Sequence, residues 1–195
     1  GLKEPTQRKW IKKFYPELKD IPIKDYMHHE THAAAGVLSS DFDECAVMVI
    51  DAIGEFDTAT IWQWKDGQLK RMHTTSYPSS LGLFYSAVTH HVGLKPMEDE
   101  YILMGMAAYG KPENWKPLSK KMGKRFFRMK HPWMSHRRTI TGKENLQRGL
   151  PKNSFVGVDE FDMAAAAQDQ VEQRITAYAQ YAKELTGSNN LVYMG

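Results

Sequence analysis

The stretch CAVMVID, residues 45–51, decides the fold that the rest of the sequence predicts. Its first six residues are continuously apolar, which is typical of a strand buried on both faces of a sheet. Two β-type runs follow at 58–64 and 68–76, and the hairpin signal KDG at 65–67 separates them. Residues 51–60 hold one glycine and three acids, and they predict a tight turn that carries functional groups. The sequence therefore predicts a meander of three antiparallel strands with 45–50 as its central strand.

Helices dominate the sequence after the meander. An apolar stripe at helical spacing predicts one helix over 81–92, and a second helix is expected over 98–109. Gly105 lies inside the second helix and predicts a close contact with another backbone there, because a helical glycine otherwise costs about 1 kcal/mol. A long helix over 162–185 and a short strand over 190–194 follow. This α/β order opens a ribonuclease-H-like lobe of the actin-like ATPase type.

Upstream of the first strand, residues 28–32 read HHETH and run into an alanine-rich segment that favours helix. A helix that begins near His28 places His28 and His32 one turn apart on one face, where two imidazoles can share a metal ion. The zinc-protease pattern HExxH needs a histidine at position 33, so Ala33 excludes that class. The alternative is a helix start with polar histidines near solvent. We expect His29 to point outward or to support a ligand.

Composition limits the class of protein further. The net charge of +3 over 195 residues is too small to argue for nucleic acid, and no apolar run approaches the length of a membrane span. The single cysteine, Cys45, fits a reducing compartment, so we expect a cytoplasmic protein. The sequence starts at Gly1 without a methionine and stops directly after a β-type run, so we expect a fragment of a larger protein. Residues 114–158 are irregular and basic, and we interpret them as an insertion.

Four motifs fall in the order and spacing of one enzyme family. They are HHETHAA at 28–34, VIDAIGE at 49–55, YPSSLGLFYSAVT at 77–89 and EYILMGMAAYGKP at 100–112. Together they resemble the O-carbamoyltransferases of the nodulation-factor and antibiotic type, which include the tobramycin and cephamycin carbamoyltransferases. The family's glycine after the strand aspartate is Ala52 here, and residues 114–158 match nothing in the family that we can place.

The resemblance implies a two-step enzyme. One module would make carbamoyl-adenylate from carbamoyl phosphate and ATP. The other, similar to the tRNA threonylcarbamoyl-transferase, would move the carbamoyl group to a substrate hydroxyl. Residues 1–44 would then end the first lobe of this transferase module, and residues 45–195 would begin its second lobe. The expected partners are a small hydroxyl acceptor (a sugar, an antibiotic or a nucleoside-like molecule) and the adenylate-forming module of the same polypeptide, with no membrane partner.

The resemblance also implies metal ligands. By motif they are His28, His32 and Asp51, with a fourth ligand from an aspartate beyond Gly195. Two imidazole nitrogens and a carboxylate oxygen suit iron, with zinc or manganese as alternatives, better than calcium. The metal can polarise a carbamoyl carbonyl as a Lewis acid. No residue can be assigned as the catalytic base.

Cofactor contacts are expected at four further positions. Three of them are in the turn that contacts phosphate in actin-like folds, namely Gly54, Glu55 and Thr58. The alternative is that the turn is merely tight and needs a glycine at position 54 for that reason. Gly195 follows the last predicted strand and is the fourth candidate.

Two other functions stay open. A tRNA threonylcarbamoyl-type transferase would keep the fold and the metal, but the YPSSLG and MGMAAYGKP segments speak against it. A non-catalytic domain that binds a nucleic acid or a partner would use the basic run 120–130 and its interleaved phenylalanines. Such charge runs are usually solvated faces, so we do not expect nucleic acid as a partner.

Overall fold

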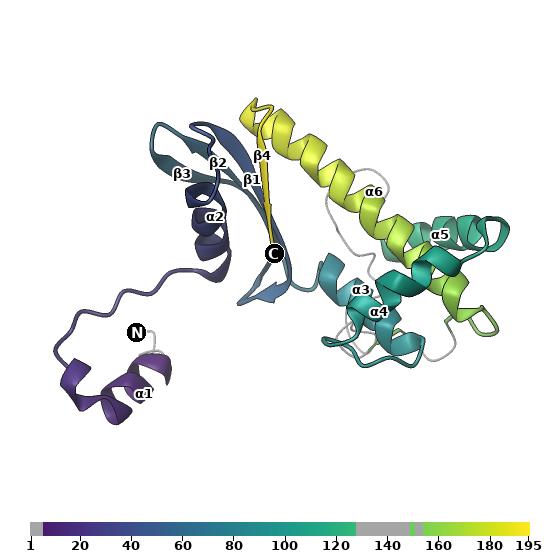
Figure 1. The fold of residues 1–195 in the computed structure, drawn as a ribbon, viewed down its shortest axis with the longest axis horizontal. Coiled ribbons are helices and arrows are strands. Elements are labelled where there is room, and N and C mark those ends of the chain that lie inside the picture. The colour runs from purple at the N-terminus through teal and green to yellow at the C-terminus, as the bar shows by residue number, and fades with distance from the viewer. Residues whose placement is uncertain (1–5, 128–148, 151–153) are drawn as a thin grey trace.

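A four-stranded mixed sheet of order β3-β2-β1-β4 organises the structure (Figure 1). The computed structural model describes residues 6–127, 149–150 and 154–195. The antiparallel meander consists of β1 (Cys45–Gly54), β2 (Asp57–Lys65) and β3 (Gln68–Ser76), and β4 (Leu191–Met194) pairs with β1 in parallel. The predicted α/β class and the meander are confirmed, and β1 is an internal strand.

Strand β1 is buried because both of its faces are covered. Successive side chains of a strand point to opposite faces. Val47 pairs with Trp62 of β2 and Val192 of β4, and these side chains pack against helix α2 (His28–Leu38). Met48, on the opposite face, belongs to the larger core beneath the other helices. A continuously apolar run is what such a two-sided environment requires.

The predicted turn over 51–60 is wrong in its extent. Strand β1 continues through Asp51 to Gly54, with a register irregularity between Ile50 and Gly54, and the turn is confined to Glu55 and Phe56. Glu55 adopts the left-handed region, with φ of 63°. The end of the apolar run marks the point where β1 becomes only partly buried, whereas the backbone ladder with β2 extends further.

The helices follow the predicted order. They are α3 (Leu81–His91), α4 (Glu100–Met106), the 3₁₀ helix η2 (Ala107–Tyr109), α5 (Pro112–Phe126) and α6 (Glu160–Thr186), preceded near the N-terminus by α1 (Thr6–Phe14) and η1 (Pro16–Leu18). Helix α6 runs from the sheet to the group formed by α3, α4 and α5 (Figure 1). In the part of the chain that the structure describes, no helix is both long and apolar enough to cross a membrane.

The structure bears on two expectations about the helical half, one for Gly105 and one for the basic region 114–158. Gly105 does not make the expected close contact, because no atom of the described residues would lie within 4 Å of a Cβ there. Helix α4 buries Leu103 and leaves Gly105 on an outer side. The first part of the basic region 114–158 belongs to α5, which packs against α6, and most of the remainder lies outside the described residues.

Candidate metal centre

Three side chains converge at the end of β1 where it passes the start of α2. Helix α2 begins at His28, so His28 and His32 lie one turn apart on one face. Asp51 on β1 completes the group. Its Oδ2 lies 2.7 Å from His28 Nε2 and 3.3 Å from His32 Nε2, and the two Nε2 atoms lie 3.1 Å apart. The structure thus brings together all three residues that the sequence predicted as ligands.

The donor set fits one transition-metal ion. Ligands held about 2.0–2.2 Å from one ion in tetrahedral or octahedral geometry lie roughly 2.9–3.4 Å apart. Two of the three observed separations, 3.1 and 3.3 Å, lie within this range and the third, 2.7 Å, lies just below it, so little movement is needed to accept an ion. The side chains of His28, His32 and Asp51 are 44, 33 and 25% exposed, which leaves the site open to a further ligand or substrate. Two nitrogens and one oxygen disfavour calcium, which takes oxygen ligands.

His29 lies behind this site and does not point outward, which corrects one of the two expectations for it. It is 1% exposed, its Nδ1 lies 3.0 Å from Thr60 Oγ1, and Trp62 Nε1 donates to the same hydroxyl at 2.8 Å. Burial lowers the pKa of His29, which favours the neutral ring. The His29 Nε2 atom is buried and has no hydrogen-bond partner among the described residues. His29 therefore anchors the start of α2 to the sheet.

A second support comes from the start of α3, and the sequence did not predict it. Ser80 is the N-cap of α3 and accepts a hydrogen bond from Leu83 N–H at 3.0 Å. Its hydroxyl also donates to the carbonyl of Ala52 at 2.6 Å, next to Asp51. A Cβ on Gly82 would lie 2.8 Å from Ala52 Cα, so only glycine allows this approach. The start of α3 thus fixes the backbone that carries Asp51.

The predicted cofactor residues near the turn occupy different environments. Gly54 lies against the histidines, because a Cβ there would sit 2.5 Å from Cδ2 of both His28 and His29. Glu55 is exposed at the hairpin turn. Thr58 is buried, and its hydroxyl donates to the carbonyls of Thr75 and Ser79. Of these three, the structure brings Gly54 into the metal site's neighbourhood, while the hydroxyl of Thr58 holds the backbone.

Gly195 lies at the end of β4, beside β1. A Cβ there would lie 2.0 Å from the carbonyl oxygen of Ile50, and its φ is +117°. Its neighbour Tyr193 had not been noticed in the sequence. Burial, and then the charge of Asp51, raise the pKa of the Tyr193 phenol. The last residues of β4 therefore sit close to the carboxylate of the candidate site.

The chain belongs to the carbamoyltransferase N-terminus family, whose model matches residues 8–195. The predicted O-carbamoyltransferase relationship is thereby confirmed. Nodulation protein NolNO of Sinorhizobium fredii is 26% identical over 189 residues, which are 93% of this chain and 26% of that protein. An uncharacterized protein of Methanocaldococcus jannaschii is 30% identical over 184 residues, 83% of this chain and 29% of its own length. An uncharacterized protein of Synechocystis is 41% identical over 109 residues, 53% of this chain and 18% of its own length.

The chain is short compared with these three relatives. It spans less than a third of each of these three relatives.

Proposed function

We propose that the protein is the transferase part of a metal-dependent O-carbamoyltransferase, which moves a carbamoyl group from carbamoyl-adenylate to a substrate hydroxyl. The observation that carries this proposal is the convergence of His28, His32 and Asp51 on one point. The family match supports carbamoyl transfer in general. Metal dependence and the adenylate intermediate rest on the donor chemistry and on the resemblance of the sequence motifs.

The roles of the residues follow from their positions. His28, His32 and Asp51 would hold the ion, with iron as the first candidate and zinc or manganese as alternatives. When bound, a divalent metal supplies Lewis-acid polarisation of a carbonyl or phosphate oxygen. His29 would keep the ring of its neighbour in place, and Ser80 would keep the Asp51 backbone in place. Gly54, Glu55 and Gly195 remain candidates for contact with the adenylate, while Thr58 would serve through the backbone that it holds.

The reaction balances without a redox partner. The bond between the carbamoyl carbon and the phosphate oxygen of the adenylate would break, and a bond to the acceptor oxygen would form. AMP would leave, and the acceptor's hydroxyl proton would pass to a base that is not among the assigned residues. A sugar, antibiotic or nucleoside-like hydroxyl is a weak nucleophile, so such help is required.

We also propose that the sheet is the start of an actin-like, ribonuclease-H-like lobe. Its support is the strand order, an antiparallel meander followed through helices by a parallel strand next to β1. The division into residues 1–44 and 45–195 stays a prediction. The carbamoyl-adenylate would come from carbamoyl phosphate and ATP in another module of the same polypeptide.

The test separates the two steps in the full-length protein. His32→Ala and Asp51→Ala should each lower metal affinity by more than about 100-fold, because loss of a ligand exceeds the usual cost of losing a residue that supports one. Single-turnover transfer from preformed carbamoyl-adenylate should be lost, while adenylate formation from carbamoyl phosphate and ATP should persist. Glu30→Ala, on the same helical turn, is the matched control. The proposal fails if both ligand variants bind metal and transfer the group at the parent rate.

A further inference from the structure

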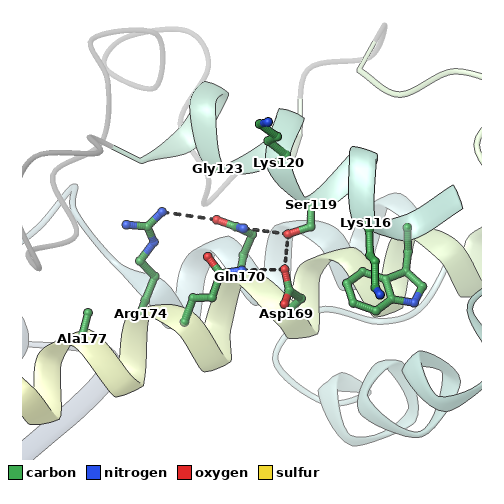
Figure 2. Close-up of a pocket in the computed structure, with 10 residues that line it drawn as sticks. Lys116, Ser119, Lys120, Gly123, Asp169, Gln170, Arg174 and Ala177 are labelled. Carbon is green, nitrogen blue, oxygen red and sulfur yellow. Dashed lines mark hydrogen bonds between the residues drawn. The ribbon is translucent and has the colours of Figure 1, made fainter. Parts of the chain in front are cut away.

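A second polar site lies between α5 and α6, apart from the metal centre. The two helices enclose a cavity of about 580 Å³. Its walls carry three basic residues, Lys116, Lys120 and Arg174, and one acidic residue, Asp169. Figure 2 shows Arg174 at one end of a chain of hydrogen-bonded side chains, Lys116 beyond the other end of that chain, and Lys120 directed away from α6. The volume is within the range of pockets that bind small molecules.

Asp169, the only acidic residue among the described residues of this lining, already accepts hydrogen bonds from neutral partners. Asp169 Oδ2 accepts hydrogen bonds from the Ser119 hydroxyl and, at 2.8 Å, from Gln173 Nε2. Ser119 Oγ in turn accepts from Gln170 Nε2 at 2.7 Å (Figure 2). Ser119 and Gln170 are each 2% exposed, so the network is buried. The carboxylate is thus held by a hydroxyl and an amide instead of by a cation.

Arg174 is the residue that this arrangement leaves without a counter-ion. Its guanidinium lies 4.7 Å from the centre of the Phe127 ring, and Nη2 donates to Gln170 Oε1 in a long contact of 3.4 Å. Its Nε is buried and has no hydrogen-bond partner in the described part of the chain. Within the described residues, no carboxylate lies at ion-pair distance from it. Burial lowers the pKa of Arg174, which reports the cost of holding this charge away from water.

We propose that the cleft between α5 and α6 binds a small phosphate-bearing molecule, with the phosphate on the Arg174 guanidinium. A partly buried cation without a counter-ion is unfavourable, and a bound anion relieves that cost. The planar guanidinium can donate two parallel hydrogen bonds to a phosphate, including one from the unpartnered Nε. Arg174 and Lys116 offer two positive charges along the cleft, and the Asp169 carboxylate is already hydrogen-bonded, so a phosphate dianion matches the site better than a single carboxylate does. Lys116 supplies charge at the far end of the same cleft.

The test measures binding of inorganic phosphate by calorimetry in the full-length protein. The His32→Ala variant, stripped of metal, is used as the parent so that phosphate cannot bind at the metal centre. Saturable binding is expected, and Arg174→Met should weaken it about tenfold or more, since hydrogen bonds between charged groups are strong. Lys183→Ala removes an exposed charge from α6 outside the cleft, so it should change the affinity less than about twofold. Acetate serves as the comparison with a single carboxylate and should bind more weakly.

A second measurement does not depend on the folding of a variant. Phosphate should slow the modification of Arg174 by phenylglyoxal in the parent protein, as mapped by mass spectrometry, and should leave Arg125 unaffected. The proposal is overturned if phosphate up to about 10 mM gives no saturable heat, if Arg174→Met binds like its parent, if acetate binds more tightly than phosphate, or if Arg174 is modified at the same rate with and without phosphate.

Discussion

The metal centre and the α5–α6 cleft are both polar sites at junctions between secondary-structure elements, but they are assembled over different distances. His28 and His32 come from one helical turn, and Asp51 follows 23 residues after His28 on an adjacent strand. In the cleft, Ser119 and Asp169 are 50 residues apart and meet only through the packing of two helices. Motif spacing can therefore reveal the first site, whereas the second is visible only in the folded structure.

The two sites also differ in the charge of the ligand that they favour. The metal centre turns two imidazole nitrogens and a carboxylate toward one point, which favours a cation. The cleft holds cations around a carboxylate that is already hydrogen-bonded, which favours an anion. One chain thus presents a candidate cation site between α2 and the sheet and a candidate anion site between α5 and α6.

Alanine at a glycine in each region should show which site is packed more rigidly. Gly54→Ala would place Cβ 2.5 Å from ring carbons of His28 and His29, and buried His29 has little room to move. We expect a loss of about 1–3 kcal/mol in the free energy of unfolding, as for overpacked cores, together with weaker metal binding. Gly123→Ala would meet the amide end of Gln170 at 2.8 Å, which can rotate.

The cost at Gly123 should be offset by the helix preference of alanine, so its net effect is expected within about 1 kcal/mol. Gly105→Ala is the control, because a Cβ there would meet no atom of the described residues within 4 Å, and it should stabilise by up to about 1 kcal/mol. Denaturant unfolding of the three variants measures the order. Equal stability of the Gly54 and Gly105 variants would contradict the rigid metal centre.

A smaller loss of stability is expected when the hydrogen bonds of Ser80, which hold the backbone next to Asp51, are removed. Ser80→Ala removes both the cap of α3 and the hydrogen bond to the Ala52 carbonyl, and it should cost about 1–2 kcal/mol. Ser39→Ala, whose hydroxyl donates to Ala35 O on the exposed end of α2, is the matched control and should stay within about 0.5 kcal/mol. Thermal unfolding compares them, and equal shifts in the two variants would mean that α3 does not hold this part of β1.

Local signals explain what the sequence could predict. The apolar run of β1, the KDG hairpin with its left-handed Asp66 and Gly67, and the serine cap of α3 each act within a few residues. The spacing of His28 and His32 is a property of one helical turn, so their shared face was predictable. The approach of Asp51 to that face came from the family resemblance, and the structure adds the geometry.

What the sequence could not predict depends on partners that are distant along the chain. Strand β1 extends past its apolar run because β2 continues to pair with it. His29 is buried because its ring lies against the sheet and is hydrogen-bonded to Thr60 of β2. Among the described residues, Gly105 has no close contact because α4 leaves it on an outer side, and no carboxylate pairs with Arg174 because Asp169 is hydrogen-bonded to Ser119 and Gln173. Each depends on tertiary packing, which overrides local pattern.

The central claim is that His28, His32 and Asp51 bind one metal ion together. Anomalous diffraction from crystals of the full-length protein, equilibrated with iron or manganese, tests it most directly. The account predicts one anomalous peak about 2.0–2.3 Å from His28 Nε2, His32 Nε2 and an oxygen of Asp51. A peak bound by other side chains, or none at this point while the three residues keep their direct contacts, would contradict it.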